Sequence, residues 1–184
     1  MTIDRSDAAA ALSDIDDIAR RVRQSRIYQF SSMMLMLWGP LTAVGNVVSW
    51  SWPRQAGYVW VAVNLFGVAA SFAASAFGKR RTGIHGFDTR VLLAFGLFFG
   101  FGLLWSVGLV HFTPRQLGAF WPIYFMLAYT IAGLWLGHAF VAIGLGITAL
   151  TLLGYFFAGD WFELWMAVVN GGGLLLGGLW MRRN

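Results

Sequence analysis

Long runs of apolar residues alternate with short polar breaks along most of this chain of 184 residues. Six runs reach the ~20 residues that an α-helix needs to cross the ~30 Å hydrocarbon layer of a bilayer. The pattern hardly pauses at Gly137 and His138, but a single helix over 117–158 would be about 60 Å long, twice the membrane thickness. We therefore predict an all-α integral membrane protein with six transmembrane helices within residues 27–184. The predicted spans are about 28–50, 58–77, 91–112, 117–136, 139–158 and 162–181.

Residues 1–26 are polar and carry five aspartates and five arginines. Within them, Leu12, Ile15, Ala19 and Val22 recur at intervals of three and four, which predicts an amphipathic cytoplasmic helix. This helix is expected either to lie on the inner membrane surface or inner loops, or to serve dimerisation or partner docking. Two heptads are too few to establish a coiled coil.

The charges are few and lie mostly at one set of span ends. Only 11% of the residues are charged, against about 25% in an average soluble domain, so lipid is the expected solvent for this chain. Between the six spans, the clustered basic residues all fall on one side, which places both termini in the cytoplasm by the positive-inside rule. These residues are Arg20, Arg21, Arg23, Arg26, Lys79, Arg80, Arg81, Arg90, Arg182 and Arg183. We expect a prokaryotic cytoplasmic membrane and no nucleic-acid partner, because the basic clusters flank apolar runs rather than forming a phosphate-binding face.

Reactive side chains are scarce. The chain has no cysteine, which excludes disulfides, thiolate metal sites and cysteine nucleophiles. Its three histidines lack the spacing of metal ligands, and the spans hold almost no ionisable groups. The sequence therefore predicts no metal site, no cofactor and no enzymatic activity, and it disfavours a carrier of protons or cations.

Small residues recur at helical spacing in three spans. Glycines four residues apart let helix backbones approach closely, because glycine has no Cβ atom. We expect these faces to pack within the bundle, with oligomerisation as the alternative. The pairs are Gly96 with Gly100, Gly133 with Gly137, and Gly173 with Gly177.

Three asparagines lie at similar depth near the outer ends of spans one, two and six. They are Asn46, Asn64 and Asn170, each on a stripe of small or polar residues. A buried amide without a partner is costly in hydrocarbon, so each asparagine must meet either water or another polar group. We predict that they line an outward-facing polar pocket with Trp60, Trp165 and Tyr124. The alternative is that they only join one helix to another.

Two classes of function follow from these patterns. One is a channel or carrier for a small neutral or weakly polar solute, favoured by the asparagine stripes and the lack of buried charge. The other is a non-transporting accessory, sensor or scaffold protein that acts through helix–helix contacts. The predicted partners are the lipid bilayer and either a homo-oligomer or a partner membrane protein.

Overall fold

The computed structural model describes the backbone of residues 5–82 and 89–183 and the side chains of 13–15, 18, 21–22, 24–75 and 93–183. Throughout this part of the chain the regular elements are helices, which confirms the predicted all-α class. The elements are α1 (Arg5–Ser51), η1 (Pro53–Gln55), α2 (Ala56–Thr82), α3 (Thr89–Leu103), η2 (Leu104–Leu109), α4 (Pro114–Leu136), α5 (His138–Phe157), η3 (Gly159–Trp161), α6 (Phe162–Met166), η4 (Ala167–Gly172) and α7 (Gly173–Arg183). The segments η2 and η4 are π-helical turns.

Five helical stretches are long and apolar enough to cross a membrane, which indicates a membrane protein. They are Gln24–Ser51, Pro53–Ser75, Pro114–Leu136, His138–Phe157 and Gly159–Arg183. The predicted span 91–112 corresponds to α3 and η2, where the apolar stretch Leu93–Leu109 is shorter. Its 17 residues cover about 25 Å, slightly less than the hydrocarbon layer. The helix ends earlier than predicted because the chain turns at His111, which has a φ of 53°.

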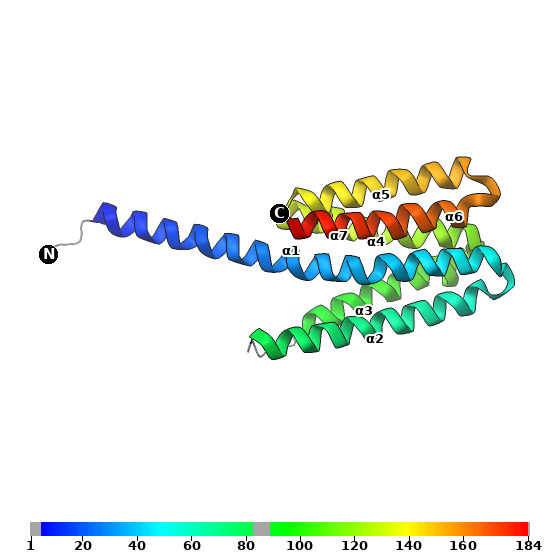
Figure 1. The fold of residues 1–184 in the computed structure, drawn as a ribbon, viewed down its shortest axis with the longest axis horizontal. Coiled ribbons are helices and arrows are strands. Elements are labelled where there is room, and N and C mark those ends of the chain that lie inside the picture. The colour runs from blue at the N-terminus through cyan, green and yellow to red at the C-terminus, as the bar shows by residue number, and fades with distance from the viewer. Residues whose placement is uncertain (1–4, 83–88, 184) are drawn as a thin grey trace.

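The first helix differs from the expected arrangement of a surface helix followed by a span. α1 runs without a break over 47 residues, about 70 Å, and its N-terminal part projects beyond the other helices (Figure 1). No glycine or proline occurs between residues 5 and 38, so nothing in the sequence interrupts the helix there. In the structure the segment predicted to be amphipathic therefore continues the helix of the first span.

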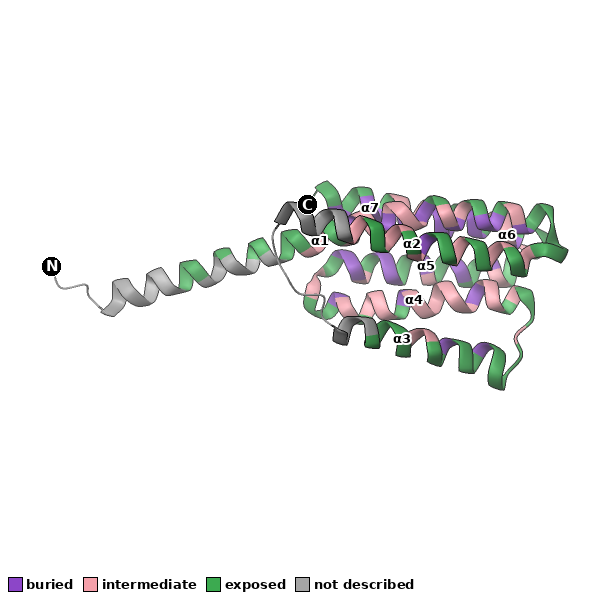
Figure 2. Ribbon diagram, turned by 90° about the horizontal axis from the view of Figure 1, so that it is seen from below, coloured by how far each residue is buried: buried purple, intermediate pink, exposed green. Residues whose placement is uncertain are grey.

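The buried residues lie mainly on α1, α5 and the α6–η4–α7 segment (Figure 2). α1 packs on α2, α6, η4 and α7, while α4 and α5 form an antiparallel hairpin. The face of α1 toward the core is made of small and polar residues and one leucine, at intervals of three and four. These residues are Ser32, Leu35, Gly39, Thr42, Asn46 and Ser49. This regular seam allows close packing of α1 against the last span.

Two of the three predicted glycine pairs lie in close contacts. A Cβ atom on Gly133 would be 2.7 Å from the backbone nitrogen of Val141, and one on Gly177 would be 2.8 Å from Ile143. Gly173 likewise faces Ile147 of α5 at 3.1 Å. Gly137 has a φ of 131°, so it forms the turn between α4 and α5, where side chains are strained.

The third pair contradicts the prediction of packing within the bundle. Gly96 and Gly100 are exposed, and a Cβ atom on either would meet no atom within 4 Å. The face that contacts the bundle instead carries Gly102 of α3 and Ser106 of η2, which lie two and six residues after Gly100. Because a helix turns 100° per residue, this shift of two residues places the predicted pair on another face.

Another close helix contact joins α1 to the last span through glycines outside the predicted pairs. A Cβ atom on Gly171 would lie 2.9 Å from the Cα atom of Ala43, and one on Gly178 would lie 3.0 Å from the carbonyl oxygen of Ser32. The Ser32 hydroxyl also donates a 2.6 Å hydrogen bond to the carbonyl of Gly178. Steric fit and an interhelical hydrogen bond thus hold the same pair of helices together.

At the end of the bundle away from the projecting part of α1, Arg115 connects the start of α4 to the end of α5. Its guanidinium donates hydrogen bonds to the carbonyl oxygens of Tyr155 at 2.7 Å and Gly159 at 2.9 Å. It also lies 5.2 Å from the ring centroid of Phe162. Carbonyl groups at a helix C-terminus lack partners within the helix, so a cation placed here satisfies them.

Candidate functional site

Two of the three asparagines use their amide groups on their own helices. The Nδ2 group of Asn46 donates to the carbonyl of Thr42 and that of Asn64 donates to the carbonyl of Trp60, both at 2.8 Å. These are bonds to the residue four positions earlier, which satisfy a polar side chain without linking two helices. Asn46 is buried on the α1 seam, whereas Asn64 is partly exposed on α2.

Asn170 has a different environment, within the π-helical turn η4. Its residue surface is only 6% exposed. The hydroxyl oxygens of Ser49 and Thr151 are also buried and lack a hydrogen-bond partner in the described part of the chain. Unpaired polar groups of this kind cost about 1–3 kcal/mol each, so they mark a place that water or a ligand would stabilise.

The helix contacts place these polar groups at similar depth. α5 and the last span are antiparallel, and Gly173 faces Ile147. Thr151, one turn after Ile147, is therefore level with Val169 in η4. Gly171 faces Ala43, so the polar end of the α1 seam is level with the start of η4. The buried polar residues Ser49, Thr151 and Asn170 therefore lie at similar depth on three different helical segments.

The three aromatic residues predicted for the pocket lie in three separate helix contacts. Trp60 packs on Gly45 between α1 and α2, and its ring would lie 3.4 Å from a Cβ atom added to Gly45. The indole nitrogen of Trp165 donates to the carbonyl of Leu150 at 2.9 Å, which joins α6 to α5. The Tyr124 hydroxyl donates to the carbonyl of Phe98 at 3.1 Å, which joins α4 to α3.

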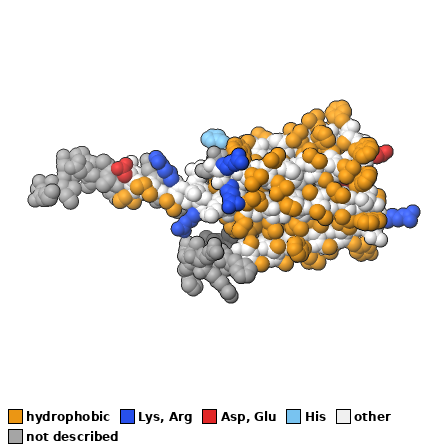
Figure 3. Space-filling model, in the orientation of Figure 1, with side chains coloured by type: hydrophobic (Ala, Val, Ile, Leu, Met, Phe, Trp, Pro, Cys, Tyr) orange, Lys and Arg blue, Asp and Glu red, His pale blue; other side chains and the backbone are white. Residues whose placement is uncertain are grey.

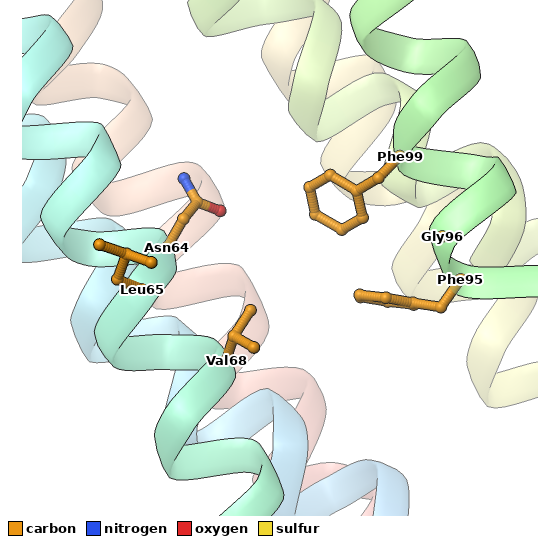
Figure 4. Close-up of a pocket in the computed structure, with 6 residues that line it drawn as sticks. All are labelled: Asn64, Leu65, Val68, Phe95, Gly96 and Phe99. Carbon is orange, nitrogen blue, oxygen red and sulfur yellow. The ribbon is translucent and has the colours of Figure 1, made fainter. Parts of the chain in front are cut away.

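A first cleft, of about 300 Å³, lies between α2 and α3. Asn64, Leu65 and Val68 face Phe95, Gly96 and Phe99 across it (Figure 4). Asn64 is its one polar lining residue, and neither of the other asparagines reaches it. The described clefts therefore do not bring all six predicted pocket residues together: Asn64 lines the cleft toward α3, while Asn46 is buried on the α1 seam.

A second cleft, of about 410 Å³, opens where α1 leaves the bundle. Its lining is polar and aromatic, and the sequence patterns did not single it out. It consists of Arg21, Gln24, Ser25, Tyr28, His138, Ala139 and Trp180. The spacing of Arg21, Gln24 and Tyr28 at intervals of three and four was the available signal that these residues share one face.

The described residues contain no group of three histidine or acidic side chains close enough to hold a metal ion. No protein-family model, curated protein or solved structure matches this chain. The arrangement of its own residues therefore carries any inference about function.

Proposed function

We propose that this protein is a non-transporting membrane protein that presents the N-terminal part of α1 as a docking helix. The observation that carries the proposal is the projection of this amphipathic segment beyond the bundle (Figure 1). Its apolar residues Ile15, Ile18 and Val22 are 61%, 62% and 48% exposed, at intervals of three and four. An apolar stripe at this spacing is the usual docking face of one helix for another.

The charges on this helix favour a different protein over a second copy as the partner. In a parallel coiled coil with Ile15 and Val22 at the a position of the heptad, Arg21 would be at position g and Arg26 at position e. Arg21 of one helix would then face Arg26 of the other. Both arginines are exposed in the single chain. Like charges at these flanking positions disfavour pairing, so a partner helix with acidic flanks is the better match.

Cysteine reactivity tests the docking helix directly, because the chain has no native cysteine. Ile18→Cys is expected to react quickly with a thiol reagent in purified protein and in proteoliposomes made of lipid alone, but slowly in native membranes. Gln55→Cys, in η1 at the other end of the bundle, serves as the control that reacts in all three settings. Protection in lipid-only proteoliposomes would instead indicate a helix lying on the membrane, and equal reactivity everywhere would contradict docking.

We further propose six spans, with both termini in the cytoplasm of a prokaryotic cell. α3 runs in the opposite direction to α2 and lies beside α4, and η2 extends it toward the far end of the bundle (Figures 1 and 2). The basic residues cluster at the end from which α1 projects, while hydrophobic side chains cover most of the bundle (Figure 3). This distribution supports a cytoplasmic location of that end.

A solute pathway is the second candidate function, favoured by the buried polar residues Ser49, Thr151 and Asn170 at similar depth. In this alternative, a small neutral solute would donate hydrogen bonds to the unpaired hydroxyl oxygens of Ser49 and Thr151. Stopped-flow shrinkage of proteoliposomes with urea as the probe tests this idea. Asn170→Leu is expected to abolish the protein-dependent permeability and Asn64→Leu to preserve it, whereas liposomes with and without the protein would behave alike if no pathway exists.

A further inference from the structure

The cleft between α1, the start of α5 and the end of α7 combines a cation with several neutral hydrogen-bond donors. Arg21 supplies a guanidinium, whose planar set of N–H groups matches the oxygens of a phosphate. Ser25 and Tyr28 add hydroxyl groups, and the Gln24 amide lies 3.5 Å from the Tyr28 hydroxyl. The lining residues include no aspartate or glutamate, so the cleft as described favours an anion.

The start of α5 adds to this preference. α5 is 20 residues long and begins at His138, and no side chain caps its first turn. The N–H group of Phe140 bonds to the carbonyl of Gly137 at 3.2 Å, while His138 and Ala139 line the cleft. The first amide groups of a helix carry partial positive charge, and they bind anions where a cavity lies beside them.

The cleft lies level with the ends of the apolar stretches, where lipid phosphates are expected. Three apolar stretches begin or end there: one starts at Gln24, one starts at His138 and one ends at Arg183. Trp180 is partly exposed at its edge, a position typical of tryptophan at the membrane interface. Exposed apolar residues continue from it along the bundle, among them Leu134 and Leu176, so lipid acyl chains would have a surface to follow.

From these observations we infer that the cleft binds the phosphate group of an anionic phospholipid. Arg21 and the start of α5 contact the phosphate, Tyr28 and Ser25 donate to its oxygens, and Trp180 packs beside the glycerol region. Basic pockets between transmembrane helices at one membrane face are a known way of holding such headgroups. The inference rests on the cleft and does not require a docking partner, although Arg21 also flanks the proposed docking face.

Lipid binding to the purified full-length protein tests the inference. Native mass spectrometry in a neutral detergent measures the apparent Kd for phosphatidylglycerol and, for comparison, for phosphatidylcholine. We expect tighter binding of phosphatidylglycerol, and about fivefold weaker binding by Arg21→Gln, since one basic residue beside an anionic lipid contributes about this factor. Arg21→Lys should bind with intermediate affinity, because it keeps the charge and loses the paired N–H groups.

The matched control is Arg54→Gln, which removes an arginine at the opposite end of the bundle. It should leave the affinity unchanged, and circular dichroism should show equal helicity in both glutamine variants. Equal weakening by the two variants would overturn the inference, since general surface charge would then explain binding. An Arg21→Gln variant that binds like the parent protein would also overturn it. Millimolar inorganic phosphate should not displace the lipid, and full displacement would assign the cleft to a free anion instead.

Discussion

A glycine-to-alanine change at Gly171 tests the contact between α1 and the last span. The added Cβ atom would lie 2.9 Å from the Cα atom and 3.0 Å from the backbone nitrogen of Ala43. Backbone atoms cannot rotate away as a flexible side chain does, so one helix must shift. Overpacking of this kind costs about 1–3 kcal/mol, and we expect the upper half of this range because backbone is involved.

The adjacent Gly172 provides a matched control, because a Cβ atom there would meet nothing within 4 Å. Both residues lie in η4, so the gain of roughly 1 kcal/mol in helix propensity from alanine should be similar in the two variants. The difference between the variants therefore isolates the steric cost. Reversible unfolding by sodium dodecyl sulfate in mixed micelles, followed by circular dichroism, measures this difference as a free energy. Equal free energies of unfolding for Gly171→Ala and Gly172→Ala would refute the close contact between the helices.

Three further predictions use the same or simpler assays. Ser32→Ala removes the 2.6 Å hydrogen bond to α7 and should lower the free energy of unfolding by about 0.5–1.5 kcal/mol, while Ser51→Ala, at an exposed site, should change it little. Arg115→Gln should cost about 1–2 kcal/mol, because the carbonyls at the end of α5 lose a charged donor; unchanged unfolding would show that water replaces it fully. In intact cells, Gln55→Cys should react with an impermeant thiol reagent and Arg183→Cys should not; labelling of the latter would contradict the cytoplasmic C-terminus.

The apolar runs were sufficient to predict the helical class and most of the helix positions, because the length needed to cross a bilayer leaves few alternatives. The turn at Gly137 was predictable for the same reason. The end of α3 was not, since it depends on the local geometry around His111 and on the π-helical turn η2. Hydrophobicity does not distinguish a regular helical turn from a π-helical one.

The faces of the helices were harder to predict than their positions. Glycines are common in membrane helices, and spacing alone does not say which of two neighbouring faces meets another helix. Gly171 and Gly178 are seven residues apart and face α1, whereas Gly173 and Gly177 face α5. The sequence could place the three asparagines at equal depth along the membrane normal, but it could not predict which side of its helix each one occupies. For this reason the predicted pocket differs from the clefts in the structure.

The unbroken course of α1 also has a mechanical consequence. A rigid rod that is anchored in the membrane and free at one end acts as a lever. The seam of α1 from Ser32 to Ser49 is packed against the bundle, so this lever turns near Gln24, where α1 leaves the bundle. The tip at Arg5 lies about 30 Å from Gln24 along the helix, and a bend of about 10° would move it by about 5 Å. A small angular change at the end of the bundle would thus become a larger displacement of the tip, and a load on the tip would exert torque on the bundle.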